Sequence, residues 1–320
     1  MNLSIGETER QRLARWRLSE ELVRREIPGG WSHDGTQIAT EPTALALLAL
    51  RSSTWASIAA ERGCRALILR RRSDGLWPAI GDRANVNFWT TAVAVNALMI
   101  LDAEPKTLAS SVDALVHGCP LEASWLVRLK FRFSDRRVRF DSRKYGWPWV
   151  PCTVSWVLPT SMALIALERA KKRGLVGGTQ VETRLRLGTE MLIDRACAGG
   201  GWNAGNSFVY GVPLRPHIDA TAIALAALRP QYQQPIVRSS LTWLLGCVQC
   251  PSAYSLAWLI LAASTYEEVR SGITPTLAAA RDRLAALVDD PQGIQDTSTV
   301  ALAALALGAG PSNNPFEVNG

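Results

Sequence analysis

One apolar pattern recurs along the whole chain, in which small and large hydrophobic side chains follow a threonine or a serine. It reads TALALLAL from Thr43, TAVAVNAL from Thr91, TSMALIAL from Thr160, TAIALAAL from Thr221 and STVALAAL from Ser298, and a weaker copy, SLAWLILA, begins at Ser255. A helix that is apolar nearly all round is buried on every side. The six copies therefore predict six inner helices, whose alanines let neighbouring helices approach closely.

A glycine-aromatic turn precedes most copies of this pattern. The turns read GGWSHDG from Gly29, DGLWP from Asp74, YGWPW from Tyr145 and GGGWNAGN from Gly199. Glycine supplies the backbone freedom that a reversal of direction requires. The tryptophan can pack between helix ends and donate its indole N–H to a neighbouring carbonyl. Each turn is therefore expected to lead into the start of an inner helix.

The segments between the copies are amphipathic and rich in arginine, as in residues 56–72, 182–196 and 235–250. Such segments are typical of outer helices, which turn one apolar stripe inward and a charged face toward water. Six inner and six outer helices make six hairpins, which are enough to close a barrel. We therefore predict an all-α fold, an (α/α)6 barrel that forms a single domain over residues 1–310, followed by a flexible C-terminal tail over residues 311–320.

Composition narrows the class of protein. With 48% hydrophobic residues, the chain is expected to be a soluble globular protein rather than a disordered one. No uninterrupted apolar stretch is long enough to span a bilayer, and the charged N-terminal segment lacks the apolar core of a secretory signal. A cytoplasmic location is therefore expected, with peripheral attachment to a membrane surface as the alternative.

The net charge of +7 comes mainly from arginine, and the basic residues concentrate between Arg128 and Lys144. The simplest interpretation is a solvated surface; the alternative is contact with a diphosphate, an acidic partner or an anionic lipid surface. Phe131, Phe133 and Phe140 stand among these arginines, which suits an anionic membrane surface. We expect this stretch to lie outside the regular hairpins. No recognised nucleic-acid-binding motif accompanies it, so nucleic acid is not expected as a partner.

The turn-plus-helix unit resembles the repeat of prenyltransferases and squalene cyclases, including the QW motif of squalene-hopene and oxidosqualene cyclases. The full motif places a glutamine six residues before its tryptophan; Arg25 holds that place before Trp31, and Arg71 holds it before Trp77. Gln249 keeps the glutamine, although the loop after it has lost the glycine and the tryptophan. The resemblance covers nearly the whole chain. It implies an α/α-toroid like the β domain of squalene-hopene cyclase, with a central cavity closed by the inner helices.

The resemblance also implies a catalytic acid. In squalene-type cyclases the protonating aspartate begins an inner helix, in a D-x-D-D-T-A motif. The fourth repeat here reads PHIDATA from Pro216, so Asp219 falls on the position of that acid, with His217 as a candidate partner. A helix N-terminus favours the charged carboxylate, so burial or a hydrogen-bonded partner must counter it. The function this implies is protonation-initiated, class II type cyclisation or rearrangement of an isoprenoid.

Other residues near the inner-helix starts complete the predicted site. Two further repeats carry an acid two residues before their first residue, Glu41 before Thr43 and Asp296 before Ser298. A cyclase cavity also needs aromatic faces to stabilise carbocations. The candidate substrate-binding residues are therefore Phe88, Trp89, Trp156, Tyr254, Trp258, Glu41 and Asp296. The competing interpretation is structural: acids near helix starts are ordinarily caps and dipole partners, and aromatics ordinarily fill cores.

Other enzymes with this kind of toroid depend on zinc ligands that this sequence does not place in the required pattern. Protein prenyltransferases share the toroid and use zinc held by Asp, Cys and His, whereas none of the three histidines here stands in the Asp-x-Cys context. Cys247 and Cys250 form one isolated C-x-x-C, which is too few ligands for zinc, so we expect neither metal nor cofactor. Squalene-type cyclases pair the toroid with a second helical domain, for which this chain has no room. Either its cavity is complete alone, or a partner chain supplies the other wall, or the protein is a non-catalytic toroid that binds an apolar ligand or a protein partner.

Overall fold

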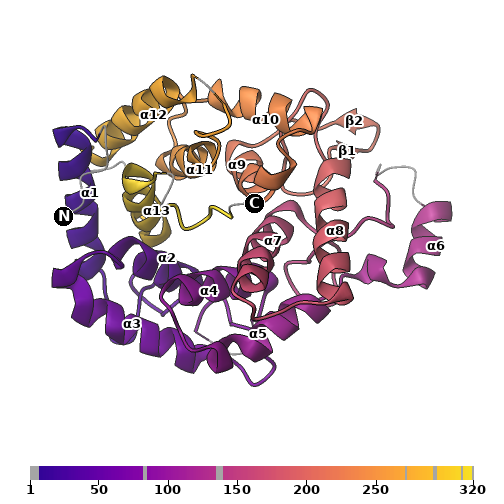
Figure 1. The fold of residues 1–320 in the computed structure, drawn as a ribbon, viewed down its shortest axis with the longest axis horizontal. Coiled ribbons are helices and arrows are strands. Elements are labelled where there is room, and N and C mark those ends of the chain that lie inside the picture. Colours follow the sequence, from indigo (N-terminus) through magenta and orange to yellow (C-terminus); the bar gives the residue numbers. More distant parts are fainter. Residues whose placement is uncertain are drawn as a thin grey trace.

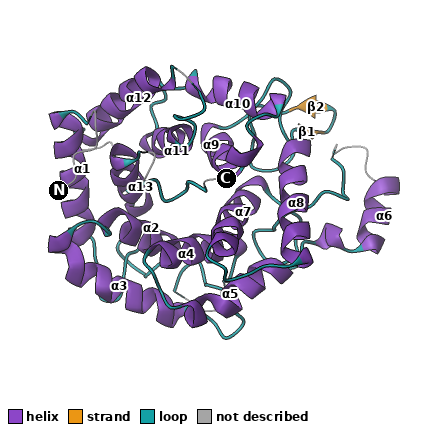
Figure 2. Ribbon diagram, viewed as in Figure 1, coloured by secondary structure: helices purple, strands orange, loops and turns teal. Residues whose placement is uncertain are grey.

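Two concentric rings of helices form a barrel (Figures 1 and 2). The computed structural model describes residues 7–81, 85–134, 140–270, 272–290, 294–310 and 313–318, without the side chains of residues 130–134. The inner helices in these ranges are α2 (Thr40–Leu50), α4 (Phe88–Ile100), α7 (Val157–Lys172), α9 (Ile218–Ala227), α11 (Ala253–Ser264) and α13 (Thr297–Gly308). The outer helices are α1 (Glu9–Arg24), α3 (Ser57–Arg70), α5 (Pro105–His117), α8 (Thr179–Asp194), α10 (Pro235–Leu245) and α12 (Ile273–Val288).

The inner ring is closed. Each inner helix packs against two others in the order α2, α4, α7, α9, α11, α13 and back to α2. Each also carries an outer helix, and the outer partner of the last inner helix, α13, is the first helix of the chain, α1. The inner helices are buried along almost their whole length, because their sequences are apolar all round. The predicted all-α (α/α)6 barrel is thus confirmed.

Four tryptophans hold the outer and inner helices in register, as the turns predict. The indole N–H of each donates to a carbonyl near the end of an outer helix, at 2.6–2.8 Å, in the pairs Trp31–Leu22, Trp77–Leu67, Trp147–Leu115 and Trp202–Leu192. The backbone N–H of each donates at 2.8–3.0 Å to the fourth residue of the next inner helix, namely Thr43, Thr91, Thr160 and Thr221. The recurring threonine is therefore a hydrogen-bonding clasp, and the turns before α11 and α13 lack its tryptophan.

The smaller elements lie outside the two rings. Helix α6 (Trp125–Ser134) projects from the barrel beyond α8 (Figure 1), so the basic stretch does begin outside the hairpins, as predicted. Residues 135–139 and the side chains of Phe131 and Phe133 lie outside the described residues. A two-stranded hairpin, β1 (Phe208–Val209) and β2 (Val212–Pro213), and three short helices, η1 (Thr54–Ala56), η2 (Leu121–Ala123) and η3 (Arg229–Gln231), complete the described elements. None of the described helices is both long enough and apolar enough to cross a membrane.

The C-terminal segment differs from the expectation of a flexible tail. Residues 313–318 turn back from α13 toward the centre of the ring (Figure 1), where Asn314, Phe316 and Val318 are buried. The physical reason is the packing and hydrogen bonding that the barrel offers: the ring of Phe316 lies 4.8 Å from that of Trp258, and Asn96 and Arg169 of the inner helices donate to the Pro315 carbonyl. Residues 311, 312, 319 and 320 lie outside the described part of the chain.

Candidate functional site

The second residues of the inner helices line one end of the barrel. Outer and inner helices alternate along the chain, so the inner helices run in one direction and their N-termini share that end. These second residues, which we call the mouth ring, are Glu41, Trp89, Leu158, Asp219, Tyr254 and Ser298. Three of them, Glu41, Asp219 and Tyr254, are polar side chains that remain half-buried. Four of the residues predicted from the sequence, Glu41, Trp89, Asp219 and Tyr254, therefore lie at the same end of the barrel.

Glu41 is hydrogen-bonded to the aromatic part of the ring. The indole Nε1–H of Trp89 donates to Glu41 Oε2 at 3.0 Å. Burial raises the pKa of the Glu41 carboxyl above its ordinary value, the Trp89 hydrogen bond and the nearby His33 oppose that shift, and Asp296 reinforces it. Because burial disfavours the charged form, Glu41 holds its proton more tightly than an ordinary glutamic acid. That is the property a proton donor needs.

Tyr254 lies among the acids of this end. Burial raises the pKa of its hydroxyl above the usual range, and the charges of Glu41, Asp219 and Asp296 push it in the same direction. The hydroxyl therefore stays neutral and can donate a hydrogen bond to a carboxylate. Asp219 is half-buried, and its carboxylate makes no hydrogen bond or ion pair with another side chain of the described residues. Two carboxyl groups and a neutral phenol thus converge at the mouth ring.

A column of aromatic rings runs inward from the mouth ring. Trp149, in the loop before α7, lies 5.8 Å from Trp89, and Trp89 lies 6.4 Å from Trp258, both measured between ring centroids. Trp258 in turn lies 4.8 Å from Phe316 of the C-terminal segment. The Trp258 indole N–H has no hydrogen-bond partner within the described residues, although it is close enough to the Tyr254 hydroxyl to lower its pKa slightly against the larger effects. Aromatic faces of this kind stabilise nearby positive charge.

Three candidate residues point elsewhere. Phe88, the first residue of α4, packs so closely on Gly118 at the end of α5 that a β-carbon there would collide with its ring. Trp156 and His217 line a separate, mostly apolar side pocket of about 400 Å³ beside the buried Arg195. His217 occupies the N-cap position of α9 without making a side-chain cap, and it is exposed. The expected pairing of His217 with Asp219 is therefore not among the contacts of the described residues.

Asp296 caps a helix. Its carboxylate accepts a hydrogen bond from the Thr299 backbone N–H at 3.0 Å and another from the Thr299 hydroxyl, so the capping interpretation holds for this acid. The fourth residue of α13, where α2, α4, α7 and α9 carry the clasping threonine, is Val300. Asp296 thus precedes α13, two residues before the helix position that Glu41 and Asp219 occupy in their helices. The sequence alignment that paired Ser298 with Thr43, and therefore Asp296 with Glu41, was wrong by two residues. It acts on the mouth ring through its charge.

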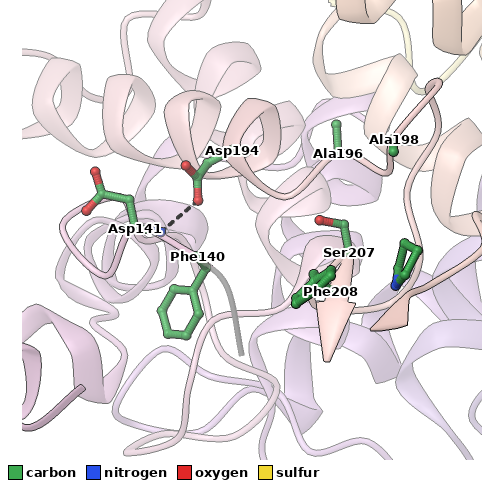
Figure 3. Close-up of a pocket in the computed structure, with 8 residues that line it drawn as sticks. Phe140, Asp141, Asp194, Ala196, Ala198, Ser207 and Phe208 are labelled. Carbon is green, nitrogen blue, oxygen red and sulfur yellow. Dashed lines mark hydrogen bonds between the residues drawn. The ribbon is translucent and has the colours of Figure 1, made fainter. Parts of the chain in front are cut away.

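A second pocket, of about 480 Å³, opens at the end of α8 (Figure 3). Two of its lining acids meet there, since the Asp141 backbone N–H donates to Asp194 Oδ2 at 2.9 Å. Both are also paired with bases, Asp141 with Arg143 at 3.0 Å and Asp194 with Lys144 at 3.3 Å. Both carboxylates are therefore held in ion pairs, and none of the sequence-predicted site residues is among those that line this pocket.

Sequence reasoning missed several members of the site. Ser298 is buried at the mouth ring with a hydroxyl that has no partner in the described chain, and its serine was read instead as the start of a repeat. His33 and Trp149 come from loops, where periodicity gives no signal. The available signal was the helix register, because the second position of each inner helix faces the same end.

Solved structures share this fold. A protein from Actinoplanes aligns with a TM-score of 0.60 at 14% sequence identity, over 93% of this chain and 98% of that one. A type II terpene cyclase, MstE from Scytonema, solved as an alanine-for-aspartate variant with its product merosterolic acid A, aligns with a TM-score of 0.60 at 14% identity, over 96% of this chain and 98% of that one. A glycosidase variant aligns with a TM-score of 0.55 at 10% identity, over 96% and 99% of the two chains. No protein-family model and no curated protein matches the chain. The chain therefore has a terpene cyclase-like α/α-toroid fold, and at these identities the likeness shows the fold alone.

Proposed function

We propose that the chain binds an isoprenoid at the mouth ring and begins its cyclisation or rearrangement by protonation, as class II terpene cyclases do. The observation that carries this proposal is the convergence of Glu41, Asp219 and Tyr254 with the indoles of Trp89 and Trp258. A protonated acid, a second carboxyl group and aromatic faces are the groups that such a reaction uses.

Glu41 is the proton donor in this proposal, because burial raises the pKa of its carboxyl. The π electrons of a substrate alkene take the carboxyl proton, a C–H bond forms, and the positive charge moves to the neighbouring carbon. The Trp89 N–H stabilises the carboxylate that remains. Asp219, the acid implied by the squalene cyclase resemblance, removes a proton from the final cation, and the Tyr254 hydroxyl passes that proton back to Glu41. The product is an isomer of the substrate, and no proton is gained or lost overall.

The comparison with MstE bears on whether one toroid is enough for a site of this kind. This chain aligns with 98% of that type II terpene cyclase, so the aligned cyclase chain contains almost nothing beyond one toroid. This length supports the proposal that the site is complete without a partner chain and that the C-terminal segment closes the barrel. The choice of an isoprenoid as the substrate is supported by the squalene cyclase resemblance and by the aromatic side chains near the mouth ring.

The isoprenoid is proposed to arrive from a membrane surface along α6. Trp125, Leu126 and Leu129 of this helix are 65%, 59% and 46% exposed, and Arg128 stands between them. An apolar face bordered by positive charge suits anionic lipid. Sedimentation with anionic liposomes tests this: binding should weaken with salt and with Trp125→Ala, and salt-insensitive binding would contradict it.

The function is tested by incubating the purified protein with prenyl diphosphates and squalene-like hydrocarbons and analysing the products by mass spectrometry. The wild type should form a cyclised isomer that the double variant Glu41→Gln/Asp219→Asn does not form. The double variant keeps similar shapes but has no acidic proton to deliver. A product formed equally by both proteins would end the assignment.

A non-catalytic apolar-binding toroid is the alternative, and one observation favours it. Trp258 and Phe316 are fully buried, so much of the barrel is filled by its own side chains. In that case tryptophan fluorescence would report saturable binding of an isoprenoid while mass spectrometry finds only unchanged ligand.

A further inference from the structure

The C-terminal segment is tied to α11 on one side. The side-chain amide of Asn314 donates to the Leu261 carbonyl at 2.6 Å and to the Ser264 hydroxyl at 2.9 Å. Its amide oxygen accepts the backbone N–H of Phe316 at 2.9 Å, which fixes the turn of the segment. Leu261 and Ser264 belong to the last turns of α11, so the segment enters at the end of the barrel opposite the mouth ring.

The same segment is tied to two further inner helices. Asn96 of α4 donates to the Pro315 carbonyl at 3.0 Å. Arg169 of α7 donates to the Pro315 carbonyl and to the Glu317 carbonyl, each at 2.9 Å, and its Nε–H to Asn96 at 2.7 Å. The segment thus bridges α4, α7 and α11 and crosses the inner ring (Figure 1). Contacts with three helices make it a fixed part of the barrel.

Phe316 is the part of the segment that reaches toward the mouth ring. It is fully buried, and its ring packs on Trp258 at 4.8 Å between centroids. Trp258 stands four residues after Tyr254 in α11, a distance of about 6 Å at 1.5 Å per residue. The whole of α11 would span about 18 Å at the same rise. Phe316 and Trp258 therefore pack on each other inside the barrel, roughly one helical turn from the mouth ring along α11.

We propose that Phe316 determines specificity: it is a floor that limits how much of an isoprenoid chain enters the barrel, so that only the terminal portion of a long substrate is enclosed. That the ligand is an isoprenoid rests on the proposed function; that the barrel is shallow rests on the packing of Phe316. A chain longer than the enclosed portion must leave its remainder outside the mouth ring. Removal of the floor should open the lower barrel to the longer chain.

The test compares the affinities of a short and a long prenyl alcohol, geraniol and geranylgeraniol, by quenching of tryptophan fluorescence. We expect Phe316→Ala to shift the affinity ratio toward geranylgeraniol by about tenfold or more, and Phe316→Leu to shift it less. Leu277→Ala, which shortens a fully buried side chain of the outer helix α12, is the control and should leave the ratio unchanged.

Binding is measured without turnover, so the two proposals can fail separately. A shifted ratio with no product from either alcohol or from the substrate panel supports the floor and refutes the cyclase. An unchanged ratio in both folded Phe316 variants, or an equal shift in Leu277→Ala, overturns the floor even where the wild type forms product. Circular dichroism establishes that each variant compared is folded; should Phe316→Ala unfold, Phe316→Leu alone decides the matter by the same ratio.

Discussion

The two ends of the inner ring differ in how well their polar groups are paired. At the end formed by the C-termini of the inner helices, the side-chain amide of Asn314 both donates and accepts hydrogen bonds, and Arg169 donates to two carbonyls of the C-terminal segment. At the mouth ring, within the described residues, the carboxylate of Asp219 has no hydrogen bond to another side chain, and the buried hydroxyl of Ser298 has no hydrogen-bond partner. Unpaired buried polar groups cost stability. The difference agrees with the proposal that one end holds the barrel closed while the other receives polar groups of a ligand.

The largest expected effect is on turnover at the mouth ring. With a substrate in hand, Glu41→Gln should lower kcat by about 10²- to 10⁴-fold, the usual contribution of a positioned acid. Asp219→Asn should lower it less, because that group only returns the proton. Asp296→Asn is the matched control, since asparagine still caps α13, and its loss should be the smallest. Steady-state kinetics by product mass spectrometry give the order, and a greater loss in Asp219→Asn than in Glu41→Gln would exchange their roles.

The next largest effect is on stability at the opposite end. Phe316→Ala removes a fully buried ring and should lower the free energy of unfolding by about 3–5 kcal/mol. Leu158→Ala at the mouth ring is the comparison, because Leu158 is only half-buried and should cost clearly less. Urea denaturation followed by circular dichroism measures both. Equal costs would mean that the two ends do not divide stability and function between them.

Glu317 should make the closed end sensitive to pH. Burial raises the pKa of its carboxyl to about 7, Glu268 and Glu267 add to the rise, and Arg229 and Arg169 oppose it. The folded state therefore binds a proton more tightly than the unfolded state, whose carboxyl titrates near 4.5. Stability should fall as pH rises from about 4.5 to about 7 and level off above that. Thermal melting of Glu317→Gln across this range should lack that component, and a parallel pH profile would contradict the assignment.

The smallest effect expected is a gain in stability at the mouth. Burial raises the pKa of Glu41 in the folded state, so the unfolded state releases this proton more readily, and that difference works against folding at neutral pH. Glu41→Gln cannot ionise, and it should melt at a slightly higher temperature than the wild type near neutral pH, with the difference shrinking on acidification. Such a gain beside lost turnover is typical of a functional residue. A lower melting temperature at neutral pH would indicate a structural role.

The sequence predicts the barrel well because its signal is local. An all-round apolar helix can only be an inner helix here, and Gly-Trp turns lead to clasps such as that of Trp31 with Thr43. The site is harder to predict, since it depends on helix register. Phe88 and Trp89 are neighbours, yet one residue of helix turns the side chain by about 100°. Only Trp89 therefore reaches the mouth ring, and only the structure separates the two.

The closed end could not be predicted from pattern at all. The last ten residues show no periodicity, and Phe316 and Val318 are their only large apolar side chains. Their burial depends on a hollow that exists only once six inner helices have assembled around it. The predicted position of Asp296 was wrong for a related reason. No tryptophan precedes α13, so the sequence S-T-V-A alone could not define the start of the helix to better than two residues.

The pairing of α1 with α13 has a consequence for how the protein is made. The apolar stripe of α1, with Ala14, Leu18 and Leu22, is synthesised well before α13, the helix that covers it. An open solenoid can add repeats one at a time, each stabilised by the one before. This ring cannot, because its first and last helices are direct neighbours and the loop between them is nearly the entire chain. Until α13 has been made, the nascent chain carries an exposed apolar stripe on α1, the kind of surface that chaperones recognise.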